Sequence, residues 1–284
     1  MHNSNRHLIL LAGGQSSRLK KSLKKEKLSE QVRKIARTQH KALVPIGNKK
    51  RPMLYYQLLQ AVEAGVTHLT LISGTENQGF QDFFAQGLGQ EFSSQMQIRY
   101  VLQEIPPGKS KPLGTADALQ QALEKQPNLL HSDFIVLNGD NLYSAQALHQ
   151  LYTLKKGRFG AIGYVASTLK YPEERLAQFA VMQTDASGYL VRLHEKPTLE
   201  QLQELLSHTG RQFISMNIFK LNGEAIWPYL KRCPISDRGE KELPQAIQLW
   251  VKDNPQALRV LERKENVPDL TTANDLEGLA ALER

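Results

Sequence analysis

The amino-acid sequence predicts an α/β fold, with a doubly wound, mostly parallel sheet in a single domain. Short apolar runs rich in β-branched residues alternate with segments whose apolar residues recur at helical spacing. Repeated strand and helix units of this kind build a parallel sheet with helices on both of its faces. The 284 residues suffice for one large core, and no Pro/Ser-rich linker or internal repeat divides them.

The first half of the chain shows this alternation most clearly. Its apolar runs predict strands at residues 7–12, 68–73, 97–103 and 133–137. The helical spacing of apolar residues predicts helices at residues 53–64, about 77–86 and 115–125. Because ligands bind outside the carboxyl ends of the strands in such sheets, we expect the functional residues in the loops that follow the strands.

Beyond about residue 144 the pattern loosens. Apolar stretches predict strands at residues 160–167, 179–184, 189–194 and 211–221, with two or three helices between them. Asp185 and Gly188 lie between two of these strands and tolerate the backbone of a hairpin turn. We expect these strands to extend the same sheet and to wall off one side of it.

The positive charge is concentrated in one segment. In residues 20–41 nine basic residues stand against two acidic ones, so this segment carries +7 of the formal net charge of +8. That distribution argues against a basic face for nucleic acid spread over the fold. Leu28, Val32 and Ile35 follow helical spacing and predict a basic helical insertion at 20–40. It acts as a structural element or homo-oligomer contact, as a cover over the substrates, or as a polyanion patch.

Composition also indicates where the chain acts. The apolar runs fall far short of the roughly 20 residues that cross a bilayer, so we expect no membrane partner. Residues 1–6 are not followed by an apolar core of signal-peptide length. Cys233 is the only cysteine, which excludes an internal disulfide and fits a reducing compartment. We therefore expect a cytoplasmic protein.

The first predicted strand is followed by a glycine-containing loop, LAGGQSSRL. Ala12, Gly13 and Gly14 allow the backbone to turn tightly and to approach phosphate oxygens. Arg18 has several donors with which to clamp a polyphosphate. A plain turn between strand and helix is the alternative. The dinucleotide-binding and P-loop motifs are excluded, because the former lacks its third glycine and the latter has Gln103 where its first glycine is required.

Three motifs in the N-terminal part follow one another in a fixed order. LAGGxxxRL is followed by Lys41 within HKALVP, and then by RPM at the start of the next predicted helix. Together they resemble the N-terminal signature of the sugar-1-phosphate nucleotidyltransferases. The resemblance implies a Rossmann-like, glycosyltransferase-A-like sheet, in which residues 1–143 bind the nucleotide and residues 144–284 the sugar. It also implies condensation of a nucleoside triphosphate with a sugar 1-phosphate to an NDP-sugar and pyrophosphate, with Mg²⁺ as cofactor.

Gln103 and the segment PLGTADAL resemble the base-recognition part of the same family. Gln103 offers both a donor and an acceptor to a base edge. The N–H groups that open the turn at Gly114 and Thr115 are suited to hold the nucleoside. A simple helix cap is the alternative explanation of this turn.

Asp140 stands directly after an apolar strand, in LNGDNL. Proteins usually supply one or two carboxylates to Mg²⁺, whose other ligands are water and substrate phosphate. The resemblance implies that Asp140 is the principal Mg²⁺ ligand and that Asn141 contacts the sugar phosphate. The alternative is a carboxylate that caps the helix near Ser144.

Three segments of the second half resemble the sugar-binding part of the family. They are FAV with Ala180, HEKP with Glu195 and Lys196, and SMNIF with Asn217. The resemblance implies that Glu195 accepts hydrogen bonds from sugar hydroxyls and that Lys196 neutralises the sugar phosphate. Asn217 stands where the family commonly has a glycine. The closing segment DLTTANDL, residues 269–276, also resembles that of the family.

Two positions depart from the family pattern. Gln245 occupies the place of a second metal carboxylate. Glu242 is then the candidate second Mg²⁺ ligand, with Glu240 as an alternative, or the site keeps one carboxylate and binds metal weakly. His40 replaces a usual proline before Lys41, which is expected to loosen the turn.

In the implied reaction the protein positions two anions and cancels their charge. Arg18 stabilises the leaving pyrophosphate, while Lys41 and Lys196 neutralise the reacting phosphoryl groups. No general base is needed, since the attacking phosphate oxygen is ionised at neutral pH. Two alternatives stay open. One is transfer to a cyclitol or other non-sugar phosphate; the other is a catalytically inactive regulator, for which Gln245 argues.

Overall fold

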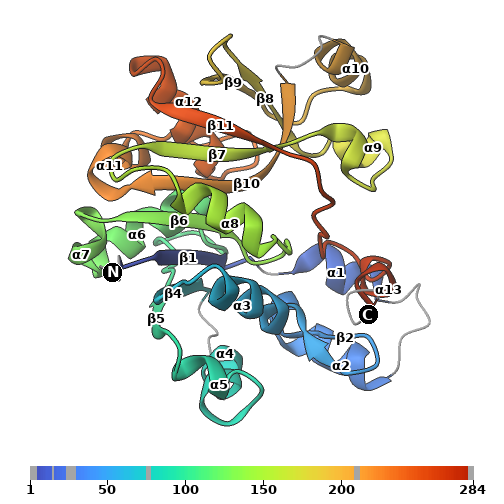
Figure 1. The fold of residues 1–284 in the computed structure, drawn as a ribbon. Coiled ribbons are helices and arrows are strands. Elements are labelled where there is room, and N and C mark those ends of the chain that lie inside the picture. The colour runs from blue at the N-terminus through green and yellow to red at the C-terminus, as the bar shows by residue number, and fades with distance from the viewer. Residues whose placement is uncertain (1–4, 15, 24–29, 75–77, 208–211, 281–284) are drawn as a thin grey trace.

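A single central sheet organises the molecule. The computed structural model describes residues 5–14, 16–23, 30–74, 78–207 and 212–280. Within these residues nine strands form the sheet: β1 (His7–Ala12), β4 (His68–Ser73), β5 (Gln97–Leu102), β6 (Asp133–Asn138), β7 (Phe159–Tyr164), β8 (Ala180–Thr184), β9 (Leu190–His194), β10 (Gln212–Asn222) and β11 (Leu258–Arg263). Their order is β11-β7-β10-β6-β1-β4-β5, with β8 beside β10 and β9 beside β8 (Figure 1).

The sheet joins a parallel half to a mixed half. β6, β1, β4 and β5 run parallel to one another. β10 runs antiparallel to β6, β7 and β8, and β11 is parallel to β7. The later strands therefore extend the same sheet on one side, and the predicted α/β fold with a mostly parallel centre is confirmed.

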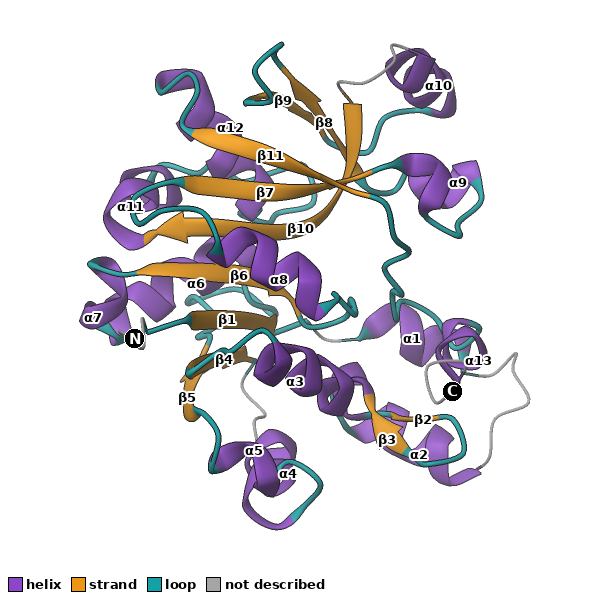
Figure 2. Cartoon of the chain, viewed as in Figure 1, coloured by secondary structure: helices purple, strands orange, loops and turns teal. Residues whose placement is uncertain are grey.

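Helices cover both faces of the sheet (Figure 2). One face carries α3 (Met53–Glu63) and α8 (Ala145–Tyr152), and the other carries α6 (Thr115–Lys125), α11 (Gly223–Lys231) and α12 (Leu243–Asp253). Along β1, Leu8 and Leu10 belong to the first core, whereas Ile9 and Leu11 belong to the second. Because successive strand residues point to opposite faces, a strand buried on both sides is apolar throughout.

A third, smaller cluster joins the basic insertion to the C-terminal part of the chain. It draws on α1 (Ser17–Ser22), α2 (Glu30–Thr38), β2 (Pro45–Ile46) and α13 (Asp275–Ala280), and β2 pairs with β3 (Arg51–Pro52). Leu19 and Ala36 share this cluster with Leu270. The N–H of Ala273 donates to the Ser22 hydroxyl over 2.9 Å. The insertion is therefore helical at both described ends and anchored to the closing segment, while Leu28 lies outside the described residues.

The remaining elements are short and lie around the sheet. They are η1 (Lys41–Leu43), α4 (Gln78–Gln86), α5 (Gln90–Ser93), α7 (Pro127–Leu130), η2 (Ala166–Thr168), α9 (Glu173–Leu176) and α10 (Leu199–Ser207). The start of α4 agrees with the predicted helix at 77–86, although Asn77 itself lies outside the described residues. No described helix has the length and apolar character needed to cross a bilayer.

Two strands differ from the sequence prediction and one turn agrees with it. The strand expected at 160–167 ends at Tyr164, because the following residues form the η2 turn. β11 was not predicted, since charged residues interrupt the apolar residues of its sequence LRVLER. The hairpin turn is confirmed: Asp185 Oδ1 accepts the N–H groups of Ser187 and Tyr189, each over 2.9 Å.

Candidate active site

The loops that leave β1 and β6 meet at the carboxyl edge of the parallel strands. The N–H of Gly139 donates to the carbonyl oxygen of Leu11 over 2.8 Å. A Cβ atom on Gly139 would lie only 2.9 Å from that oxygen, so the close approach requires glycine. The glycine loop and the Asp140 loop therefore begin side by side, at the edge where open α/β sheets bind ligands. Figure 1 shows α1 and α13 together beyond the carboxyl end of β1.

Gly13 brings the first loop close to Gln103. A Cβ atom on Gly13 would lie 2.8 Å from Gln103 Oε1, whereas Gly14 has open space at that position. Ser16 ends the loop with a left-handed φ of 55°, and its hydroxyl accepts the Lys41 N–H over 3.1 Å. The first loop and the Lys41 segment are thus joined, although the basic insertion separates them in the sequence.

Lys41 lies against Asp140. Its ammonium forms an ion pair with Asp140 Oδ2, and the two side chains are 12% and 24% exposed. His40 Nδ1 accepts the Ala42 N–H over 3.2 Å and so caps the η1 turn. Burial, and then the charge of Lys41, lower the pKa of His40 to about 4, so the ring is neutral at pH 7. His40 fixes the turn, contrary to the expectation that it loosens it.

Asp269 is a site residue that the sequence reasoning did not single out. The N–H of Leu270 donates to the Asp140 carbonyl oxygen, and that of Leu142 to the Pro268 carbonyl oxygen, each over 2.8 Å. This pairing brings the closing segment alongside the Asp140 loop. The pKa of Asp269 is raised by burial and then by the charge of Asp140, so the two carboxylates are neighbours. The resemblance of residues 269–276 to the family was the available signal.

The two carboxylates fit a divalent cation. Lys41 holds Asp140 at Oδ2, while Asp269 Oδ2 accepts from Arg175 Nη2 over 2.5 Å and from the Thr271 hydroxyl over 2.8 Å. Within the described ranges, the second oxygen of each carboxylate has no hydrogen-bond partner. The same part of the chain has no group of three or more His, Cys, Asp or Glu suited to a metal. Two carboxylates with a free oxygen each suit a divalent cation whose other ligands are substrate phosphate and water.

Gln103 is held in one orientation. Its Nε2 donates to the Gly114 carbonyl oxygen over 2.9 Å and to Asp117 Oδ2 over 2.8 Å, and the residue is only 2% exposed. Both N–H groups of the amide are thus used inside the protein. Its carbonyl oxygen lies next to Gly13 and accepts no hydrogen bond from the described residues.

The turn at Gly114 and Thr115 packs against the segment before α12. Gly114 has a φ of 106°, and a Cβ atom there would lie 2.7 Å from the Lys241 carbonyl oxygen. The Thr115 hydroxyl accepts the Leu243 N–H over 2.9 Å, and the Ala116 N–H donates to the Lys241 carbonyl oxygen over 3.0 Å. This turn therefore has a structural role in joining the two halves of the chain.

The predicted sugar residues lie where β10 changes partners. Residues 212–215 of β10 pair with β8, and residues 218–222 pair with β6. Asn217 lies at this fork. Ala180 is opposite Ser215, and the end of β9 that precedes Glu195 pairs with the start of β8. The strand register thus brings Ala180, Glu195 and Asn217 to the same end of the sheet.

A group of charged side chains surrounds Glu195. Glu195 keeps access to solvent, yet its pKa is raised by partial burial and then by the charge of Glu242. The pKa of Lys196 is lowered, first by burial and then by Arg238, with Arg18 adding a smaller effect. Arg238 in turn forms an ion pair with Glu242. Arg18 and Lys196, predicted from distant motifs, are therefore close enough to influence one another.

Glu242 lies in this charged group. Besides Arg238, the Ser236 hydroxyl donates to it over 3.4 Å. Glu240 pairs with Lys111 over 2.6 Å. The predicted metal role of Glu242 stays a prediction, while Asp269 is the carboxylate that the fold brings next to Asp140.

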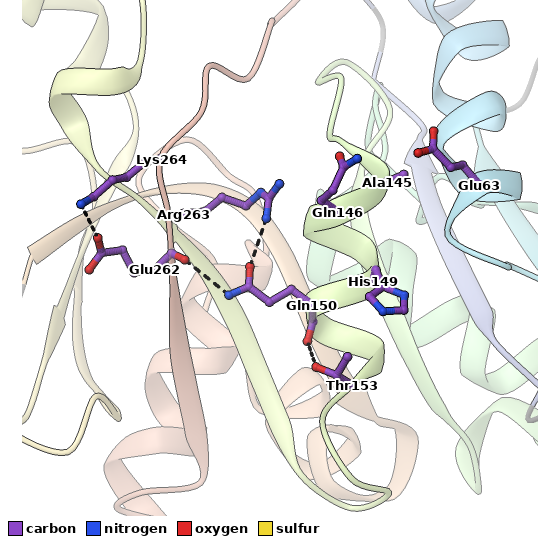
Figure 3. Close-up of a pocket in the computed structure, with 9 residues that line it drawn as sticks. All are labelled: Glu63, Ala145, Gln146, His149, Gln150, Thr153, Glu262, Arg263 and Lys264. Atoms are coloured by element: carbon purple, nitrogen blue, oxygen red, sulfur yellow. Dashed lines mark hydrogen bonds and ion pairs between the residues drawn. The ribbon is translucent and has the colours of Figure 1, made fainter.

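An open groove of about 730 Å³ lies elsewhere (Figure 3). It is bounded by α8, the end of α3 and residues 262–264 at the end of β11, and none of the predicted site residues lines it. In its wall Lys264 pairs with Glu262 over 3.4 Å, and Gln150 Nε2 donates to the Glu262 carbonyl oxygen, also over 3.4 Å. We therefore keep the candidate site at the carboxyl edge of the parallel strands and do not assign it to this groove.

Comparison with known proteins agrees with this geometry. A low-salt glycan biosynthesis nucleotidyltransferase of Haloferax volcanii is 28% identical over 245 residues, covering 86% of this chain and 57% of the relative. A glucose-1-phosphate thymidylyltransferase of Streptomyces antibioticus is 30% identical over 240 residues, covering 84% of this chain and 56% of the relative. The chain spans about half the length of the first curated relatives that it matches.

The fold has close counterparts among solved structures. A UDP-glucose pyrophosphorylase complexed with UDP-glucose superimposes with a TM-score of 0.73 at 15% identity, covering 98% of each chain. At that identity the likeness concerns the fold. The family model described as Nucleotidyl transferase matches residues 7–280, which is nearly the whole sequence. The chain therefore belongs to the nucleotidyl transferase family.

Proposed function

We propose that this chain condenses a nucleoside triphosphate with a sugar 1-phosphate to give an NDP-sugar and pyrophosphate. The observation that carries the proposal is the meeting of the glycine loop, Lys41 and Asp140 at the carboxyl edge of the parallel strands. A glycine loop suits the phosphates of a nucleotide, and the adjacent Asp140 suits their metal. Relatives of similar sequence are named for nucleotidyl transfer to sugar phosphates.

The chain's own residues hold two anions in line and neutralise them. The loop at Gly13 and Gly14 approaches the triphosphate, and Arg18 stabilises the leaving pyrophosphate. Lys41 moves from Asp140 to the α-phosphate, and Lys196 neutralises the sugar phosphate. An oxygen of the sugar phosphate forms the new bond to the α-phosphorus, while the bond to the bridging oxygen of the β-phosphate breaks. The attacking oxygen is already ionised, so no proton is transferred.

We assign the Mg²⁺ ligands to Asp140 and Asp269, in preference to Glu242. When bound, the ion supplies Lewis-acid stabilisation of the charge on the phosphates. Arg175 and Thr271 orient Asp269 by donating to its Oδ2. Asp269 also removes the main support for an inactive regulator, which was the missing carboxylate at Gln245.

The residues around each substrate indicate which acceptor and which base edge they can bind. The wall for the sugar consists of Glu195, Asn141, Ala180 and Asn217. The carboxylate of Glu195 accepts hydrogen bonds from the sugar hydroxyl groups. A cyclitol phosphate has the same hydroxyl groups and is the second candidate acceptor. The Gln103 carbonyl oxygen accepts from an N–H of the base. We assign the reaction to the cytoplasm, which supplies nucleoside triphosphates.

The test is pyrophosphate release with Mg²⁺ over a grid of five nucleoside triphosphates and a panel of sugar and cyclitol 1-phosphates. We expect turnover with at least one pair that contains a sugar 1-phosphate. Asp140→Asn should abolish it while the circular dichroism spectrum is unchanged. Turnover with a cyclitol phosphate alone would favour the second acceptor class. Triphosphate binding without turnover on any pair would refute the transferase.

A further inference from the structure

Asn217 has an unusual backbone for a residue inside a strand. Its φ is 57°, in the left-handed region that favours glycine. The pairing of β10 with β7 shifts register between Ser215 and Phe219, so Asn217 lies in a bulge. Bulges and left-handed residues of this kind concentrate at functional sites, where they direct a side chain.

The bulge lies between the two parts of the candidate site. On one side, β10 pairs with β8, with Ser215 opposite Ala180. On the other, it pairs with β6, which leads to Asp140. The Tyr143 hydroxyl donates to the Met216 carbonyl oxygen over 2.5 Å and so ties the bulge to the Asp140 loop. Asn217 therefore lies in the strand that connects the Asp140 side of the candidate site to its β8 side.

The side chain of Asn217 has hydrogen-bonding capacity to spare. Its Oδ1 is buried and has no partner among the residues described. The residue as a whole is only partly buried, so the carboxamide lies at the boundary between core and solvent. A buried carbonyl oxygen without a donor is unfavourable, and a ligand hydroxyl would relieve it. A glycine would adopt this positive φ without strain and would bury no carbonyl oxygen. Packing alone therefore does not explain the asparagine.

We propose that Asn217 selects the acceptor, by turning its carboxamide oxygen to accept a hydrogen bond from one hydroxyl of a hexose 1-phosphate. The inference rests on the proposed function and deepens it. Glu195, at the same end of the sheet, is likewise an acceptor. The substrate class is therefore a hexose 1-phosphate with a free hydroxyl at the carbon that faces Asn217. A sugar that is deoxygenated or acylated at that carbon is not expected to be a good substrate.

The experiment measures kcat/KM for the hexose 1-phosphate that is active in the substrate grid and for its 2-, 3-, 4- and 6-deoxy analogues. For the wild-type protein we expect one analogue to lose about tenfold, the value of one hydrogen bond. Asn217→Gly should lower kcat/KM for the parent sugar phosphate by a similar factor. For that one deoxy analogue its kcat/KM should equal that of the wild type, because the hydrogen bond is already absent. Asn217→Asp keeps an acceptor oxygen and tolerates a positive φ, so it should keep the preference.

Gln256→Gly is the matched control. Gln256 also has a positive φ, of 62°, but it is exposed in the turn before β11. Both glycine variants should melt at or above the wild-type temperature, and Gln256→Gly should leave the sugar preference unchanged. If Asn217→Gly keeps the wild-type ratios of kcat/KM between the parent sugar phosphate and every deoxy analogue, the inference is overturned while the proposed function stands. A wild-type protein inactive on every pair would overturn the proposed function and the inference with it.

Discussion

Replacement of Lys41 by methionine should have opposite effects on metal binding and on turnover. In the free protein the Lys41 ammonium is paired with Asp140 Oδ2, the carboxylate that we assign to the metal. A cation that binds without substrate must compete with that ammonium. Lys41→Met removes the competitor but also the charge that neutralises the α-phosphate. The backbone N–H of Lys41, which donates to the Ser16 hydroxyl, is unaffected.

The size of the effect follows from the ion pair. Hydrogen bonds to charged groups contribute about 1.5–3 kcal/mol. The side chains are 12% and 24% exposed, so solvent screens part of the interaction and we take the lower end. A difference of about 1.4 kcal/mol is tenfold in a dissociation constant. We therefore expect Lys41→Met to bind a divalent cation about tenfold more tightly in the absence of nucleotide, and to lose about 100-fold in kcat.

Mn²⁺ binding followed by electron paramagnetic resonance, without nucleotide or sugar phosphate, measures this directly. Lys21→Met is the matched control, because Lys21 is exposed on α1 and carries the same charge. Its Mn²⁺ affinity should equal that of the wild type. If Lys41→Met binds Mn²⁺ no more tightly than the wild type, Lys41 does not occupy the metal site and the reasoning is refuted.

Three further results are expected. Gly114→Ala should lower the free energy of unfolding by about 1–3 kcal/mol in urea melts, because φ is 106° and the new Cβ would lie 2.7 Å from a backbone oxygen. Gly108→Ala, at φ 76° in open space, should cost less; equal losses would count against the steric argument. Burial lowers the pKa of Lys196, so kcat/KM should fall as the pH rises through a value below the ordinary lysine pKa of 10.5. Lys196→Arg should extend activity to higher pH, and an unchanged alkaline limb would assign that limb elsewhere. Asp269→Asn should weaken Mn²⁺ binding by about tenfold or more, and Glu242→Gln should not; the reverse pattern would restore Glu242 as the ligand.

The strand and helix units were predictable because the central strands are buried on both faces. HLILLA in β1 and DFIVLN in β6 are continuous apolar runs, and such runs distinguish parallel strands from surface segments. β11 escaped prediction for the opposite reason. It lies at the edge of the sheet, and its exposed charged residues Arg259 and Glu262 interrupt the apolar run.

The site was predictable only where a motif carries its own chemistry. Gly13 and the acid Asp140 after a strand follow from local patterns and Lys41 from the family resemblance, and the fold brings the three together. Asp269 does not, since its place beside Asp140 depends on pairing between segments far apart in the sequence. The use of Glu242 by Arg238 likewise depends on a contact that no local pattern indicates.

The most direct test of the central claim follows the phosphate of the sugar. The wild-type protein is incubated with Mg²⁺, a nucleoside triphosphate and a sugar 1-phosphate labelled with ³²P, and the products are separated by anion-exchange chromatography. If the sugar phosphate attacks the α-phosphorus, the label should appear in the NDP-sugar, and the pyrophosphate should be unlabelled. Label that stays in the sugar phosphate while the triphosphate is consumed, or that is released as inorganic phosphate, would contradict nucleotidyl transfer.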